Sequence, residues 1–384
     1  MKFGSGFFYV CFSAAVNLMV PSMGQGSELD KTLRLISESS KKVSYQGVLT
    51  QLRLTASGDT LRFSQRLVHQ SPDFDRIDVL EPSARRGVVV IRTHGEVYRR
   101  EGIGDTLVYS RRSQLGPDVL DMGLDFGRLD LLGANYELAL RDAPSLLGRP
   151  TALLTISPRH PGRHAKTAWI DTQTGIVLRT EDRDELGTLA EIVFFSSLQI
   201  NPLIDSAQFE TIEWKDRAIE VNEVIACGSY TEVQREAGFP LSAPVYLPPG
   251  FMLERLRVLR FAGQRMVHFS YTDGLAQLSL FERVAAATDS AAQVWPGGSP
   301  ELRGDVRVWK REPYTILRRS DRGKLSTVVS TLSESESMKL IQSLCVLQTP
   351  ESEASSTNNT PWMISGFVGL VLVAGWFWHR RSLS

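Results

Sequence analysis

The sequence predicts an α+β protein with three parts: a long, curved antiparallel β-sheet with helices against one face, a smaller α+β domain, and a C-terminal transmembrane helix. Segments rich in β-branched and aromatic residues recur between short polar turns, which is typical of antiparallel strands. Both ends of the chain are apolar, and a length of 384 residues leaves room for two domains between them.

The N-terminus has the features of a secretory signal peptide. Lys2 supplies a positive charge, residues 7–16 form a short apolar stretch, and small residues near Ser22 favour cleavage after Gly24. We therefore expect residues 1–24 to be a signal peptide. The alternative is an uncleaved membrane anchor.

Residues 27–207 are expected to form the first domain. A helix is predicted over 27–41, where Leu33 and Ile36 lie on one apolar stripe. One or two short helices are predicted over 118–132. The expected strands are 45–54, 61–69, 74–80, 88–93, 97–100, 106–111, 136–141, 151–156, 167–171, 177–181 and 189–198.

A linker with a short helix is expected over 208–242, and a small α+β domain over 243–349. Ser333 and Glu336 form a capping box that predicts the start of a helix near the end of this domain. The expected strands of the second domain are 253–261, 265–271, 276–283, 306–310, 314–319 and 324–330.

The C-terminus predicts a membrane anchor. A polar spacer over 350–360 precedes a predicted transmembrane helix over 361–379. Its charge-free run begins at Trp362 and ends at Trp378, and tryptophans are common at membrane interfaces. The basic tip, 380–384, is expected in the cytoplasm by the positive-inside rule. This topology predicts a periplasmic body anchored in the inner membrane. The alternative is a buried core helix.

The composition and motifs argue against nucleic-acid binding and against catalysis. Lys plus Arg and Asp plus Glu both number 43, so the basic excess of a nucleic-acid binder is missing. His160 and His164 are four apart, but Pro161 and Gly162 prevent the helix that would align them on a metal. We find no catalytic constellation and no cofactor or metal motif, so we expect a binding protein rather than an enzyme.

Three arginine pairs stand out at strand ends and turns of the first domain. Arginine suits phosphate and carboxylate because its planar fork donates two hydrogen bonds. We expect an anion- or partner-binding patch here, the alternative being dispersed, solvated charges. The candidate residues are Arg85, Arg86, Arg99, Arg100, Arg111 and Arg112.

Cysteine usage allows one disulfide in the exported body. Cys11 leaves with the signal peptide, so Cys227 and Cys345 remain in an oxidising compartment and permit a single pairing. We expect this bond to join the entry of the second domain to its exit. The alternative is two separate thiols.

Several motifs, taken together and in order, resemble the MucB/RseB family of regulators of the envelope-stress sigma factor. The matching stretches are Ser44–Leu49, Arg85–Arg92, Asn135–Leu138, Leu147–Pro150, the Trp-x-Asp-x-x-Thr-Gly turn from Trp169 to Gly175, Tyr246–Phe251 and Tyr271–Phe281. The resemblance covers residues 40–345.

The resemblance implies a first domain like the lipoprotein carriers LolA and LolB, an open half-barrel with a helical lid over an apolar cavity. Joined to the apolar strand residues, it predicts a lipid cavity. The residues expected to line this cavity are Val48, Leu52, Leu61, Phe63, Val89, Ile91 and Leu107.

For function, the resemblance implies a membrane-tethered negative regulator. It binds the periplasmic part of a membrane anti-sigma factor, shields that part from proteolysis, and is released by a lipid, a lipoprotein or lipopolysaccharide. A second copy of the chain is a further candidate partner. The rival interpretation is a lipoprotein or lipid carrier, or a chaperone of the LolA type.

Overall fold

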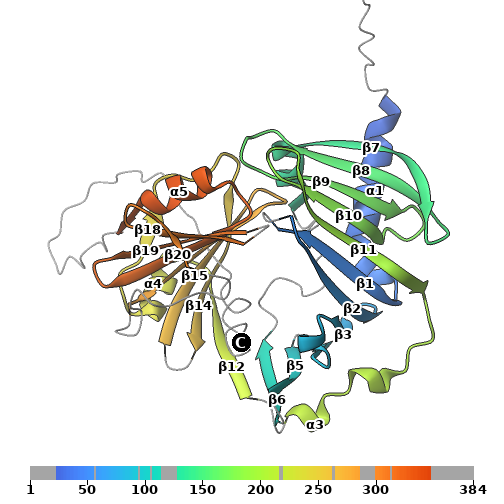
Figure 1. The fold of residues 1–384 in the computed structure, drawn as a ribbon, viewed down its shortest axis with the longest axis horizontal. Coiled ribbons are helices and arrows are strands. Elements are labelled where there is room, and N and C mark those ends of the chain that lie inside the picture. The colour runs from blue at the N-terminus through green and yellow to red at the C-terminus, as the bar shows by residue number, and fades with distance from the viewer. Residues whose placement is uncertain are drawn as a thin grey trace, which may run out of the picture.

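A computed structural model describes residues 23–55, 58–93, 96–103, 106–113, 128–215, 219–261, 264–285, 299–311 and 314–346. It places two β-sheets side by side, with the N-terminal helix on one sheet and two short helices on the other (Figure 1).

The first domain contains one long helix and eleven strands among its described residues. Its helices are α1 (Met23–Lys42), η1 (Ser83–Arg85), α2 (Leu129–Asn135), η3 (Ser206–Phe209) and α3 (Ile212–Lys215). Its strands are β1 (Tyr45–Leu54), β2 (Thr60–Gln70), β3 (Phe74–Glu81), β4 (Val89–Thr93), β5 (Glu96–Ile103), β6 (Thr106–Ser113), β7 (Tyr136–Leu146), β8 (Arg149–Pro158), β9 (Ala165–Asp171), β10 (Val177–Arg183) and β11 (Leu189–Ile200).

The second domain begins with β12, inside the segment expected as a linker. Its helices are α4 (Tyr230–Ala237) and α5 (Glu334–Gln342). Its strands are β12 (Ile219–Cys227), β13 (Ser242–Pro244), β14 (Met252–Phe261), β15 (Gln264–Thr272), β16 (Gln277–Val284), β17 (Glu301–Arg303), β18 (Val306–Arg311), β19 (Tyr314–Asp321), β20 (Lys324–Ser330) and β21 (Leu344–Val346).

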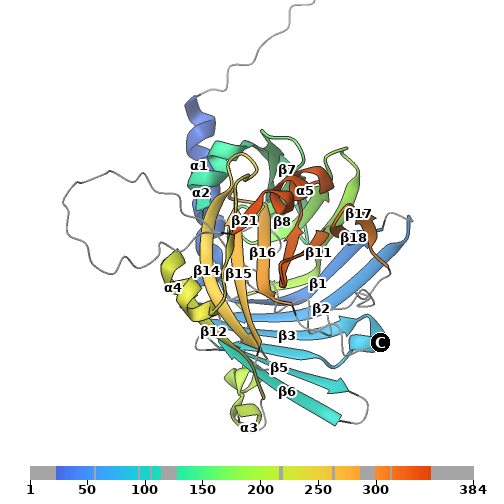
Figure 2. The same cartoon turned by 90° about the vertical axis from the view of Figure 1, so that its left-hand side faces the viewer.

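The strand pairings form one continuous ladder through both domains. In the first domain the order is β7-β8-β9-β10-β11-β1-β2-β3-β4-β5-β6, with every pair antiparallel. β12 then pairs in parallel with β6 and antiparallel with β14. The order continues β14-β15-β16-β20-β19-β18-β17. The strands of the two sheets run in clearly different directions (Figure 2).

Alternation along each strand gives the first sheet two faces. On one face, Leu33 and Ile36 of α1 are buried with Leu154 and Ile170; we call this the α1 face. On the opposite face, the connection after β11 places Trp214 and its neighbour Phe209 against Val68 and Ile91. Each face therefore buries apolar residues against a different part of the chain.

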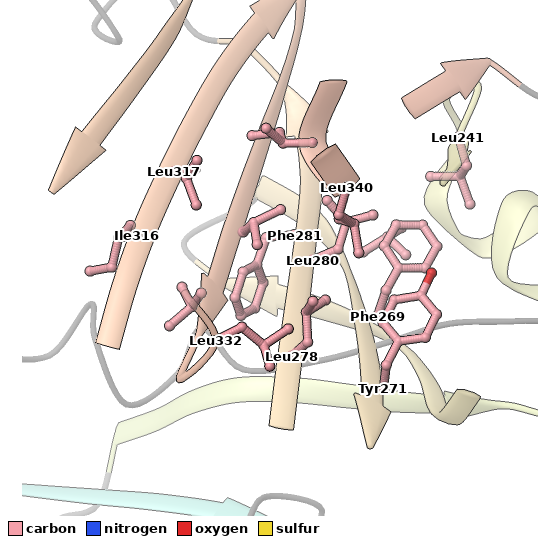
Figure 3. Close-up of a cluster of buried hydrophobic side chains, with 14 of the residues drawn as sticks. Leu241, Phe269, Tyr271, Leu278, Leu280, Phe281, Ile316, Leu317, Leu332 and Leu340 are labelled. Atoms are coloured by element: carbon pink, nitrogen blue, oxygen red, sulfur yellow. The ribbon is translucent and has the colours of Figure 1, made fainter. Parts of the chain in front are cut away.

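The second sheet carries both of its helices on one face. Val233 of α4 and Leu340 of α5 are fully buried in the same apolar cluster as Phe269 and Leu280 (Figure 3). Burial of each such side chain stabilises the folded state by roughly 1.5–3 kcal/mol, so this cluster is a main source of the second domain's stability. α5 begins as the capping box predicts, because the Ser333 hydroxyl accepts the amide proton of Glu336 at 3.4 Å.

Two expectations about architecture are corrected. The fold is mostly β rather than α+β, because the described helices after α1 are short and strands fill most of both domains. The transmembrane helix expected over 361–379, and with it the inner-membrane anchor, is not supported: among the described residues no helix is long and apolar enough to cross a membrane. Residues 347–384 lie outside the part of the chain that the structure describes, as do residues 1–22 of the expected signal peptide.

The helical segment expected over 118–132 falls mainly on residues 118–127, which are outside the described part. Its described remainder belongs to α2. Leu132 of α2 is buried in the same apolar cluster as Leu33 of α1 and Tyr136, so α2 packs on the α1 face of the first sheet.

Candidate functional site

Strand register divides the expected cavity residues between the two faces. Val48 on β1 lies opposite Arg66 on β2, and Arg66 lies opposite Asp78 on β3. Asp78 in turn lies opposite Val89 on β4, so both valines are on the face opposite α1. Phe63 lies opposite Gln51, one position out of phase, and so belongs to the α1 face. By the same register, the face of Val48 and Val89 also carries Leu52, Ile91 and the position of Leu107. Leu61 lies on the α1 face with Phe63.

Two of the residues expected to line the cavity are already packed. Val89 and Ile91 are 3% and 1% exposed and share a cluster with Phe209 and Trp214. Val48 and Leu52 are half-buried. The face opposite α1 therefore carries most of the expected residues. Where Val89 and Ile91 lie, this face is covered by the connection after β11.

Alternation also separates the arginine pairs. Arg99 and Arg100 are neighbours on β5 and so point to opposite faces. Arg99 forms an ion pair with the buried Glu101 on its own side, whereas the Arg100 guanidinium lies 5.4 Å from the ring centroid of Trp214. Arg111 and Arg112 occupy consecutive register positions, opposite Tyr98 and Val97.

The structure brings Arg85 toward Arg99. Burial lowers the pKa of Arg85, Arg99 lowers it further, and Glu101 opposes both effects. Arg86 is exposed, and its Nε donates to the Leu80 carbonyl at 3.3 Å. Arg85 and Arg99 thus lie around one carboxylate, that of Glu101.

The disulfide expected between Cys227 and Cys345 is not formed in the structure, where both thiols are free. Cys227 lies in β12 opposite Leu256, while Cys345 lies in the separate β13–β21 ribbon opposite Ala243. Burial raises the pKa of the Cys227 thiol to about 11.

A buried polar cluster that the sequence did not point to joins the two domains. The Asp273 carboxylate, in the turn between β15 and β16, accepts the amide protons of Leu275 and Ala276 at 3.0 and 2.7 Å. Its other oxygen accepts a hydrogen bond from the Tyr136 hydroxyl at 2.8 Å and forms an ion pair with the Arg163 Nη1, also at 2.8 Å. Tyr136 and Arg163 belong to the first domain, so this carboxylate is shared between domains.

Asn135 and Arg163 extend the contact to a second turn. The Asn135 amide donates to the carbonyls of Gly250 and Asp273 at 3.3 and 3.0 Å. Arg163 donates to the Pro249 carbonyl, and its guanidinium lies 5.1 Å from the ring centroid of Phe251. We call Asn135, Tyr136, Arg163 and Asp273 the junction cluster.

The members of the junction cluster are buried and affect one another's pKa values. Arg163 is 2% exposed and Asp273 is 0% exposed. Burial raises the pKa of the Asp273 carboxyl, while Arg163 and the other donors oppose that rise. Burial also raises the pKa of Tyr136, so its hydroxyl stays protonated and donates. Removing one member of a buried ion pair leaves an uncompensated buried charge, which strongly destabilises the protein.

Backbone contacts tighten the same junction. Gly274 has a positive φ of 101°, and a Cβ there would lie 2.4 Å from the Leu132 nitrogen. The Ser333 amide donates to the Gly162 carbonyl at 2.9 Å, which ties the loop before Arg163 to the start of α5. With the β6–β12 pairing, the two domains are joined at two separate places.

The residues of the junction cluster lie partly in two sequence stretches that were singled out separately. The Asp273-Gly274 turn lies in one of the stretches that resemble the MucB/RseB family, and Asn135 and Tyr136 open another. Nothing in either stretch indicates that the two meet, since Tyr136 and Asp273 are 137 positions apart.

Comparison with known sequences matches the first domain to one family. Residues 28–215 match the family model "MucB/RseB N-terminal domain". The sigma factor AlgU regulatory protein MucB of Pseudomonas aeruginosa is 28% identical over 205 residues, covering 52% of this chain and 57% of that protein. The sigma-E factor regulatory protein RseB of Haemophilus influenzae is 23% identical over 218 residues, covering 56% and 60%.

The chain therefore matches less than two thirds of the length of these two relatives in sequence. Comparison with solved structures extends the similarity of fold to both domains. MucB in the Pseudomonas aeruginosa MucA/MucB complex superposes with a TM-score of 0.59 at 20% identity, covering 84% of this chain and 100% of that one. MucB in complex with MucA(peri) gives a TM-score of 0.57 at 19% identity, covering 83% and 99%. Residues 28–215 thus match a MucB/RseB N-terminal domain, which confirms the resemblance that the sequence motifs indicate.

Proposed function

We propose that this chain is a sigma-factor regulatory protein that binds the periplasmic part of a membrane anti-sigma factor. The observation that carries the proposal is the fold: both domains, joined at the junction cluster, correspond to MucB in its complex with MucA(peri). The relatives with matching sequence are both regulatory proteins of sigma factors, which supports a binding role rather than an enzymatic one.

The proposed regulation depends on the fraction of the anti-sigma factor that is bound by this chain. A bound anti-sigma segment is covered by the chain and so is shielded from proteolysis. A lipid or lipopolysaccharide ligand lowers the occupancy, and Arg85 beside Arg99 is suited to its phosphate. Release then exposes the anti-sigma factor and activates the sigma factor.

Calorimetric titration tests the binding step. The full chain is titrated with the periplasmic segment of an anti-sigma factor from the same organism, and we expect saturable one-to-one binding. Absence of binding under conditions where both proteins are folded would contradict the proposed function.

A lipoprotein carrier of the LolA type has less support. Its acyl chain needs the face opposite α1, where Val89 and Ile91 pack against Phe209 and Trp214. A chain that binds a fluorescent fatty acid but does not bind the anti-sigma segment would favour the carrier.

A further inference from the structure

The first sheet ends in a long edge strand. β7 is the outermost strand of this sheet and pairs with β8 alone in the part of the chain that the structure describes (Figure 1). The opposite end of the strand ladder is β17, which has three residues. A very short edge strand protects a sheet against pairing with another chain, whereas β7 has eleven residues. β7 is therefore the edge at which a further strand has room to pair.

The unpaired hydrogen-bonding groups of β7 occur at every second residue. At the start of the β7–β8 ladder, the Arg159 amide donates to the Asn135 carbonyl at 2.9 Å. Hydrogen-bonded and non-bonded positions alternate along an antiparallel pair, and this register has no shift from 136 to 143. Odd-numbered residues of β7 therefore bond to β8. Even-numbered residues, such as Leu138 and Leu140, direct their amide and carbonyl groups to the free edge.

Both ends of this free edge are closed to regular pairing. At the N-terminal end, the Tyr136 amide already donates to the Leu132 carbonyl of α2. At the C-terminal end, Pro144 has no amide proton and lies within a shift of the β8 register. The segment left for a partner strand is 136–142, and its central residue is Ala139.

The side chains of this segment are complementary to themselves about Ala139. Glu137 and Arg141 are placed symmetrically on either side of it, on the face opposite α1. Both are exposed, and neither makes a hydrogen bond or an ion pair with any residue that the structure describes. Leu138 and Leu140 are half-buried and extend the apolar cluster of the α1 face. One face of the segment thus offers opposite charges, and the other offers an apolar margin.

We propose that two copies of the chain pair through 136–142, antiparallel, with Ala139 of one copy opposite Ala139 of the other. Glu137 of each copy then faces Arg141 of the second copy at a non-bonded position, where cross-strand side chains are closest. Leu138 of each copy forms a hydrogen-bonded pair with Leu140 of the second copy, as the free edge of β7 requires. The first sheet continues through the two-fold axis of an isologous dimer.

Charge complementarity selects this occupant and this register. Moving one strand by a single residue sets even positions opposite odd ones and breaks the hydrogen-bond alternation. Moving it by two residues sets Glu137 or Arg141 opposite Ala139 and loses the ion pairs. Pairing of one strand buries less area than a standard interface, so we expect a weak dimer that forms as the protein concentration rises.

Sedimentation of the full chain over a series of concentrations tests the pairing. The unmodified chain should shift from monomer to dimer. Glu137→Arg should weaken dimerisation by about tenfold or more, because its ion pairs become like-charge contacts, and Arg141→Glu should do the same. Glu185→Arg is the matched control. Glu185 is exposed in the turn after β10, so the same change of charge there should leave dimerisation unaffected.

A mixture of the two charge variants gives the sharpest result. In a mixed dimer, each arginine of the Glu137→Arg chain faces a glutamate of the Arg141→Glu chain. The equimolar mixture should therefore dimerise under conditions where each variant alone is monomeric. This recovery would also show that both variants are folded. Failure of the mixture to recover dimerisation would contradict the proposed register.

Cysteine cross-linking tests the register separately. In a full chain whose three native cysteines are replaced by alanine, Ala139→Cys should form a disulfide-linked dimer under oxidising conditions. Directly opposite, non-bonded residues of an antiparallel pair have a spacing that suits a disulfide. Asp142→Cys is the control, because Asp142 is exposed but faces position 136 of the second copy, and it should not cross-link. Cross-linking of the control alone would overturn the inference.

The inference and the proposed function have distinguishable outcomes. A chain that is monomeric at every concentration, or equal effects of Glu137→Arg and Glu185→Arg, would overturn the inference and leave the function standing. If the chain is monomeric and Glu137→Arg instead weakens binding of the anti-sigma segment, the edge takes that partner and the inference is wrong. If the dimer forms as described and the anti-sigma segment does not bind, the function is wrong.

Discussion

Three hydrogen-bond donors and the Arg163 guanidinium surround the Asp273 carboxylate, and two of these groups, Tyr136 and Arg163, come from the other domain. We expect Asp273→Asn to lower the free energy of unfolding by about 3–5 kcal/mol, because it leaves the buried Arg163 charge without its partner. Denaturant unfolding measures this loss. Asp305→Asn is the matched control: Asp305 pairs with Arg319 at 2.6 Å but is 57% exposed, so its removal should cost under about 1 kcal/mol. Similar losses for both variants would contradict the role of the junction cluster.

The two thiols should differ in reactivity. Cys345 is exposed, whereas burial raises the pKa of Cys227 to about 11. Because the thiolate is the reactive form, alkylation near pH 8 should modify Cys345 first, and the rate at Cys227 should rise with pH toward its pKa. Mass spectrometry of the digested, non-reduced protein follows both sites. Protection of both cysteines until a reductant is added would show instead that they form a disulfide.

At the scale of elements, the turn at Gly274 carries the closest approach between the domains. A Cβ on Gly274 would lie 2.4 Å from the Leu132 nitrogen, whereas a Cβ on Gly304 would meet nothing within 4 Å. Both glycines have positive φ, so alanine costs roughly 1–2 kcal/mol of backbone strain at either position. We expect Gly274→Ala to destabilise the protein clearly more than Gly304→Ala in thermal unfolding. Equal shifts in melting temperature would mean that the contact with α2 is loose.

The individual elements could be predicted because their signals are local. The strand expected over 45–54 is β1, the short helix expected within 208–242 is α4, and the Ser333 capping box starts α5. Faces and contacts could not be predicted in the same way, because they depend on register between strands. Phe63 and Val48 have the same apolar character, yet their pairing with Gln51 and Arg66 places them on opposite faces.

Long-range pairing also explains what the sequence missed. Arg163 lies in a loop between β8 and β9 and shows no motif, and only the fold brings it to Asp273. The segment over 208–242 has the composition of a connection, but β12 within it pairs with both β6 and β14.

At the scale of the whole molecule, the junction cluster and the β6–β12 pairing couple the two domains. We expect a single cooperative transition in scanning calorimetry of the full chain. The Asp273→Asn variant should separate this into two transitions, because it breaks one of the two connections. Two transitions in the unmodified protein would show that the domains unfold independently.

We propose that the chain restrains an envelope-stress sigma factor by protecting the anti-sigma factor that it binds. The most direct measurement is a transcriptional reporter for the envelope-stress sigma factor in cells that lack this chain. We predict that deletion raises reporter activity under stress and that the unmodified gene restores the original level. Reporter activity that is unchanged by the deletion, with and without envelope stress, would contradict the account.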